Sequence, residues 1–119
     1  MKQYSFILLI ILISGRLEAQ VNAQKLIESQ LKVIENYVAE IEKAKRTMRV
    51  NETVTIKTDP INAAKFLEEQ SGIKCDKEQT YDGMYIPSRK NLKDWKAWYR
   101  KNKKSMYWDE KLGKVKIRN

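Results

Sequence analysis

Histidine is absent from the 119 residues, and cysteine occurs once, as Cys75. Because histidine is the usual general base and metal ligand, only carboxylates, lysine and tyrosine remain for catalysis. A single cysteine excludes an internal disulfide and a thiolate zinc site. The four glycines are scattered, so no loop has the glycine pattern that cradles phosphates. We therefore expect no bound metal and no cofactor.

Paired carboxylates are the remaining candidates for catalysis. They occur at Glu40 and Glu42 and again at Glu68 and Glu69. Such pairs on charged helices usually form solvated surface, and neither pair lies beside a glycine-rich segment. The acidic residues at positions 76, 82, 109 and 110 lack the spacing of a calcium loop. We therefore predict no catalytic residues and no enzymatic activity.

The first 19 residues have the layout of a secretory signal peptide. A basic start is followed by an apolar run from Phe6 to Ile13 and by a short segment with small residues. A transmembrane helix needs about 20 apolar residues, and this run is followed by Arg16 and Glu18. We therefore expect the segment to be removed, leaving no permanent membrane anchor, and the protein to be exported by a bacterium to the periplasm or the medium.

Two positions satisfy the small-residue rule for cleavage, after Ala19 or after Ala23. The rule alone does not choose between them, and we favour Ala19. No cysteine directly follows the apolar run, so a lipid anchor of the lipoprotein type is not expected. Cys75 is expected to be buried and inert, and the alternative is a bridge between two chains.

Residues 20–50 are predicted to form a long amphipathic helix. Between positions 24 and 48 the apolar residues recur mostly at alternating spacings of four and three; they are Ile27, Leu31, Ile34, Val38, Ile41 and Met48. This seam has two interpretations: the buried face of a helix within its own domain, or the contact between two copies of the chain. Val33, Tyr37 and Ala44 widen the apolar stripe and favour the first.

Residues 51–119 are predicted to form a small domain, which gives the chain an α+β fold. Residues 51–57 are either a strand or an extended linker. Asp59 and Pro60 predict the start of a second helix, with the proline at its first helical position, and Gly72 predicts its end. Residues 74–87 are expected to be a loop held in place by aromatic side chains.

A third helix is predicted to start at Ser88, with Asn91 as a competing start. Leu92, Trp95, Trp98 and Tyr99 share one of its faces. We expect this cluster to be core rather than a surface that stacks on a ligand. After it, a turn between residues 109 and 113 separates Tyr107 from the alternating run that ends at Ile117, which predicts a β-hairpin.

The net charge of +9 is distributed unevenly. Residues 20–72 carry equal numbers of basic and acidic side chains, so the basic excess of the exported chain lies in residues 73–119. On the third helix six cations fall in one sector, which we call the basic stripe: Arg89, Lys93, Lys96, Arg100, Lys103 and Lys104.

The basic stripe is either a solvated face or a binding surface for an anionic partner, held mainly by charge and weakened by salt. An acidic protein, an acidic glycan or anionic lipid head groups of the cell envelope would suit it. Nucleic acid is the least favoured partner, because an exported protein has limited access to it and the aromatic side chains lie on the opposite, core-facing side.

The segment from Leu92 to Lys103 reads L-K-D-W-K-A-W-Y-R-K-N-K, and Tyr107, Trp108 and Asp109 follow it. This W-x-x-W-Y and Y-W-D arrangement resembles a short pattern near the ends of exported bacterial proteins and HEAT-repeat-associated proteins of unassigned function. The likeness extends loosely to residues 59–72 and 85–88 and leaves out the long helix. It implies an accessory or packing module and offers no catalytic residues to carry over.

These observations predict a small exported protein that acts as a non-catalytic binding or accessory module in the cell envelope. The alternative is a structural protein that forms homo-oligomers through the apolar seam of the helix at residues 24–48.

Overall fold

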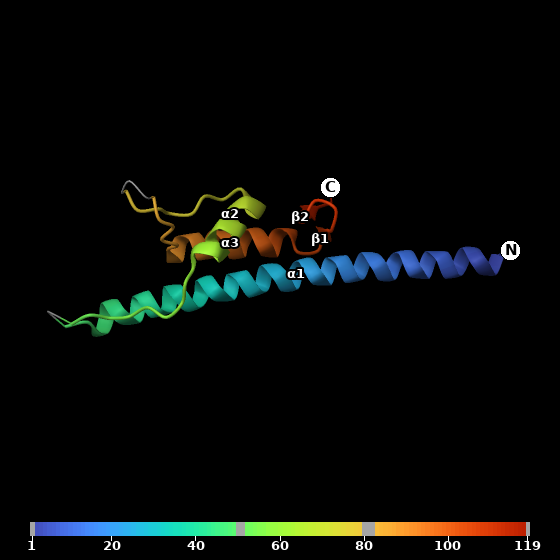
Figure 1. Ribbon diagram of the computed structural model, residues 1–119. Helices are drawn as coiled ribbons and strands as arrows, with labels where there is room; N and C mark the ends of the chain where they lie inside the picture. Colours follow the sequence, from blue (N-terminus) through green and yellow to red (C-terminus); the bar gives the residue numbers. More distant parts are fainter. Residues whose placement is uncertain (1, 50–51, 80–82, 119) are drawn as a thin grey trace.

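The computed structural model describes residues 2–49, 52–79 and 83–118, with side chains described from Gly15 onward. Three helices precede one antiparallel hairpin, which confirms the predicted α+β fold. The elements are α1 (Lys2–Thr47), α2 (Ile61–Ser71), α3 (Arg89–Asn102), β1 (Met106–Asp109) and β2 (Lys114–Ile117). The long helix α1 forms a rod, and the other elements lie along one side of it (Figure 1).

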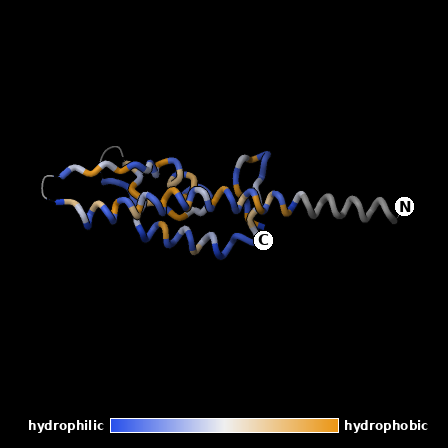
Figure 2. The backbone as a smooth tube through the Cα atoms, turned by 90° about the horizontal axis from the view of Figure 1, so that it is seen from below, coloured by the Kyte–Doolittle hydropathy of each residue, from blue (hydrophilic) through white to orange (hydrophobic). Residues whose placement is uncertain are grey.

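Helix α1 carries the predicted seam, and the seam is the core of this chain. Ile27 and Ile34 are 0% exposed, and Leu31 and Val38 are also buried. Ile41 is half-buried, whereas Met48 lies beyond the end of the helix and is exposed. Hydrophobic and hydrophilic residues alternate along the helices (Figure 2). Because α2, α3 and the hairpin already cover the seam, a second copy could use it only after these elements had moved away.

The helix is continuous through the predicted cleavage region, with no break at residue 19 or 23. The sequence assigned residues 1–19 and 20–50 to separate units, because the composition changes between them. Nothing in the local chemistry stops a helix there, since residues 16–25 contain neither glycine nor proline. Among the described residues, no helix is both apolar enough and long enough to cross a membrane.

Helix α2 starts one residue later than predicted. Pro60 is the residue before the helix and not its first member, and an Asp59 carboxylate oxygen accepts a hydrogen bond from the Ile61 N–H at 3.0 Å. The predicted end is confirmed: Gly72 adopts a left-handed conformation with φ 74°. Its N–H donates to the Glu68 carbonyl at 2.9 Å, which closes the last turn.

Helix α3 starts after Ser88, and the side chain of Asn91, in the first turn, caps the same helix start. The Ser88 hydroxyl accepts from the Asn91 N–H at 3.2 Å, and the Asn91 side chain accepts from the Ser88 N–H at 3.0 Å. The two candidate starts are therefore the two halves of one capping box. Leu92, Trp95 and Tyr99 are buried, whereas Trp98 is half-buried at the edge of the core.

The predicted hairpin is confirmed, with Met106 opposite Ile117 and Asp109 opposite Lys114. The Asp109 carboxylate accepts from the Leu112 N–H at 3.1 Å and so starts the turn, as its position predicted.

The described residues 52–60 form no strand, so the linker interpretation of this segment holds. The Glu40 carboxylate fixes it to α1 by accepting from the backbone N–H of Lys57 at 2.8 Å and from the hydroxyl of Thr58.

Candidate functional site

An acidic ladder on α1 faces the basic stripe on α3. Glu28, Glu35 and Glu42 recur every seven residues and so lie along one edge of the helix. Helix α3 runs antiparallel to α1 beside this edge (Figure 1). Arg89 pairs with Glu42, with its Nε 2.9 Å from one carboxylate oxygen, and Lys96 lies 3.6 Å from Glu35. The stripe is therefore partly neutralised within the molecule.

Two contacts of this ladder shift the pKa of a group that takes part in them. The hydrogen bond from Arg89 lowers the pKa of the Glu42 carboxyl, and the same bond raises the pKa of Arg89. At the other end of the ladder the Tyr99 hydroxyl donates to Glu28 at 2.5 Å. Burial, followed by this contact with Glu28, raises the pKa of Tyr99. The tyrosine is therefore a fixed donor and does not titrate near neutral pH.

Four members of the stripe have no acidic partner among the described residues, and two of them, Lys93 and Arg100, lie on α3 itself. Lys93 and Arg100 are exposed, and among the described residues neither has an acidic partner within 4.0 Å. Around the axis of α3, they lie next to Arg89 and Lys96, on the side farther from α1. The stripe thus has an inner row held by glutamates and an outer row open to solvent.

Lys103 and Lys104 lie at the end of α3 and take part in the fold through their backbone. Their carbonyls accept from the side-chain amides of Gln24, at 2.8 Å, and Gln20, at 3.2 Å. Both lysine side chains are exposed. The predicted stripe is therefore shorter than expected: α3 ends at Asn102, so only Arg89, Lys93, Lys96 and Arg100 lie on the helix, and Lys103 and Lys104 follow it.

Two neighbouring hollows border α3, one lined by α3 alone and the other by α1 and α3. One, of about 280 Å³, is lined by Arg89, Leu92, Lys93, Lys96 and Arg100. The other, of about 290 Å³, is lined by Glu28, Leu31, Lys32, Glu35, Lys96, Tyr99 and Arg100. Lys96 and Arg100 border both hollows, and we call the two neighbouring hollows together the basic groove.

A further hollow, of about 360 Å³, lies between α1 and the segment that leads into α3. Its lining includes Tyr37, Ile41 and Pro87, together with the Glu42–Arg89 pair, so two of its charged groups already compensate each other. No group of three or more potential metal-ligating side chains occurs among the described residues.

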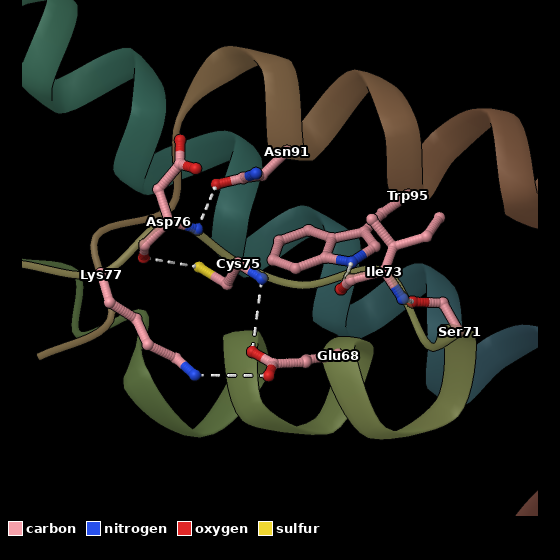
Figure 3. A network of polar contacts seen from close by, with 8 residues as sticks. All are labelled: Glu68, Ser71, Ile73, Cys75, Asp76, Lys77, Asn91 and Trp95. Carbon is pink, nitrogen blue, oxygen red and sulfur yellow. Dashed lines mark hydrogen bonds and ion pairs between the residues drawn. The ribbon is translucent and has the colours of Figure 1, made fainter. Parts of the chain in front are cut away.

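A second network of polar contacts, around Glu68 and Cys75, holds the segment after α2 in place (Figure 3). Glu68 accepts from the Cys75 N–H at 3.3 Å and from Lys77 at 3.4 Å. The Cys75 thiol is buried and donates to the Asp76 carbonyl at 3.2 Å. Burial, with nearby Glu68 and Asp76, raises the pKa of this thiol to about 12. Since the thiolate is the reactive form, the interpretation of Cys75 as a buried and inert residue agrees with this environment.

Three of the four paired carboxylates have partners within the fold. Glu40 holds the linker, Glu42 holds Arg89, and Glu68 holds the start of the segment after α2. None of these contacts was predicted from the sequence. The seven-residue repeat of Glu28, Glu35 and Glu42, matched by the equal spacing of Arg89 and Lys96, was the signal that could have found the ladder.

Comparison with protein-family models, with curated proteins and with solved structures gave no match for this chain. The resemblance of the W-x-x-W-Y segment therefore stays a prediction.

Proposed function

We propose that this protein is an exported, non-catalytic binding module of the bacterial cell envelope, and that its basic groove binds a linear polyanion such as an acidic polysaccharide. The observation that carries this proposal is the outer row of Lys93 and Arg100, two cations without acidic partners on the bank of a groove. Export rests on the composition of the first 19 residues.

The acidic ladder prepares the groove for an anion. Glu35 and Glu42 hold Lys96 and Arg89 on the side of α3 that faces α1, so these side chains line the groove before any ligand arrives. Such preorganisation reduces the ordering cost of binding. The charge that remains free for a ligand is that of Lys93 and Arg100, with Lys32 on the opposite bank.

The spacing of these cations suits an extended chain. Lys93 and Arg100 are seven residues apart, which places them about 10 Å apart along the helix axis. A ligand with repeated negative groups can contact both while lying parallel to the helices. A small anion would reach only one of them at a time, so polymer length should increase the affinity.

A polymer held by charge fits this groove better than a protein or a membrane surface. Protein interfaces have an apolar centre, and surface-bound helices insert apolar side chains into lipid. In the groove Leu31, Leu92 and Tyr99 are all buried. The exposed large apolar side chains of the described residues lie elsewhere: Leu17, Val21, Met48, Val54, Met84, Ile86, Leu112 and Ile117.

The test is binding of fluorescently labelled polygalacturonate, a linear polymer of carboxylate sugars, measured by anisotropy at low and moderate salt. We expect the double variant Lys93→Glu and Arg100→Glu to weaken binding by about tenfold or more. Monomeric galacturonate should not compete at comparable carboxylate concentration. Raising the salt should weaken the wild-type complex.

The matched control reverses Lys101 and Lys111, which are exposed, lie outside the groove and change the net charge by the same amount. Equal losses in both double variants would show that net charge alone drives binding, and would overturn the proposal. If the protein bound vesicles of anionic phospholipid more strongly than the polymer, and the groove variant bound them equally well, a membrane surface would replace the polymer as the proposed partner.

A further inference from the structure

The first hydrogen bonds that the described part of α1 makes to another element begin at Gln20. The side-chain amide of Gln20 donates to the Lys104 carbonyl at 3.2 Å, and that of Gln24 donates to the Lys103 carbonyl at 2.8 Å. Among the described residues before position 20, positions 15–18 are exposed and only Ala19 is half-buried.

The core itself begins three residues later, at Ala23. Its side chain is 0% exposed, as is that of Ile27 one turn further on. A cut after Ala23 would remove this buried methyl group together with Gln20, and would place a charged terminus directly beside the core. A cut after Ala19 leaves every buried residue of the described helix in place.

The end of α3 and a new start of α1 at residue 20 would also have complementary charges. The end of α3, at Asn102, leaves carbonyl groups that carry partial negative charge. Gln20 and Gln24 donate from α1 to the carbonyls of Lys104 and Lys103, which directly follow this helix end. An α-ammonium group on Gln20 would therefore lie on the same side of the molecule as the negative end of α3, which is a favourable arrangement.

One contact is lost by such a cut. Gly15, Glu18 and Ala19 form part of a hollow of about 250 Å³ beside Trp108 of the hairpin. Gly15 and Glu18 are exposed, and Trp108 is also packed against the core. Removing residues 1–19 therefore opens one side of this hollow and leaves Asn22, Trp108 and Glu110 in place.

We infer that the chain is processed at the peptide bond between Ala19 and Gln20, an inference that rests on the proposed export. A signal peptidase hydrolyses this bond: water adds its oxygen to the Ala19 carbonyl carbon, the C–N bond breaks, and the nitrogen leaves protonated as the α-amino group of Gln20. The mature protein is then residues 20–119, which retains both glutamine contacts and the whole described core.

The experiment is intact-mass spectrometry of the full chain, expressed with its own N-terminus and a C-terminal tag in a bacterium that has a periplasm. The expected mass in the periplasm or the medium is that of residues 20–119, with or without the loss of ammonia that follows cyclisation of an N-terminal glutamine. Ala19→Leu should abolish this product and accumulate the uncut chain.

Val21→Asp is the matched control, because it disables the rule for a cut after Ala23 at an exposed position. It should leave the product of residues 20–119 unchanged. An exported product of residues 24–119 would overturn this inference while leaving export intact. A wild-type chain that stays uncut in the cytoplasm would overturn the proposed export, and the cleavage inference with it.

Discussion

Trp95 is the largest side chain that is fully buried, and it connects three parts of the fold. Its ring lies in the core, and its indole N–H donates to the Ile73 carbonyl at 3.2 Å, shortly after the end of α2 (Figure 3). Trp98, on the same helix, is only half-buried. The two residues were alike in the sequence pattern, yet their environments differ.

We therefore predict that Trp95→Ala destabilises the protein by about 3–5 kcal/mol, because it leaves a large cavity and an unpaired carbonyl. Trp98→Ala should lower the free energy of unfolding by clearly less. Urea unfolding of the two variants and the wild type measures this difference. Equal losses would mean that Trp98 is as buried as Trp95, and a loss near zero for Trp95→Ala would contradict the core described here.

Residue-level signals were the part of the fold that could be read from the sequence. Ser88, Gly72 and Asp109 each act on backbone groups within four residues of themselves, so composition and order were sufficient to place them. Asn91 was ambiguous because its side chain accepts from Asp76, 15 positions away, as well as from Ser88. A contact of that range leaves no local signature.

At the scale of the elements, the linker between α1 and α2 is fixed by one carboxylate. Glu40 accepts from the backbone of Lys57 and Thr58 and from the Thr58 hydroxyl. The hydrogen bond from the Thr58 side chain is the main reason why the pKa of Glu40 is lowered from 4.5. The unfolded chain therefore takes up this proton at a higher pH than the folded chain does.

This shift predicts a pH-dependent contribution to stability. The contribution of Glu40 is present above its unfolded pKa of 4.5 and is lost as the pH falls through the lower folded value. Glu40→Gln should therefore lower the melting temperature at pH 7, and the difference from the wild type should shrink below pH 4.5. Thermal scans across this range provide the measurement.

Glu69→Gln is the control, because Glu69 lies exposed on α2 and forms no hydrogen bond among the described residues. Its difference from the wild type should be small and similar at each pH. A Glu40→Gln difference that stays constant from pH 7 to strongly acidic pH would contradict the role assigned to the carboxylate.

The pairing of elements was harder to predict than the elements themselves. The seam of α1 was visible in the sequence, but whether it faced its own domain or a second copy depended on α2, α3 and the hairpin together. The acidic ladder is similar: Glu35 and Lys96 are 61 positions apart in the chain, and only the antiparallel packing of α1 and α3 brings them together.

At the scale of the whole molecule, the elongated shape comes from α1, whereas the basic charge comes from the second half of the chain. One long helix supplies the platform and the acidic ladder, and the basic excess of the second half is arranged beside it. Part of that excess neutralises the ladder and part remains on the groove. The sequence predicted which side of α3 is basic, but it could not divide the stripe into paired and free cations.

The most direct test of the groove is a titration of the isotope-labelled protein with unlabelled polygalacturonate, followed by amide chemical shifts. The account predicts that the largest changes occur at Lys32, Lys93, Lys96 and Arg100, on the two banks of the groove. Changes spread equally over basic residues outside it, such as Lys74, Lys111 and Lys114, would contradict a defined site. Such a result would mean that the basic stripe is ordinary solvated surface.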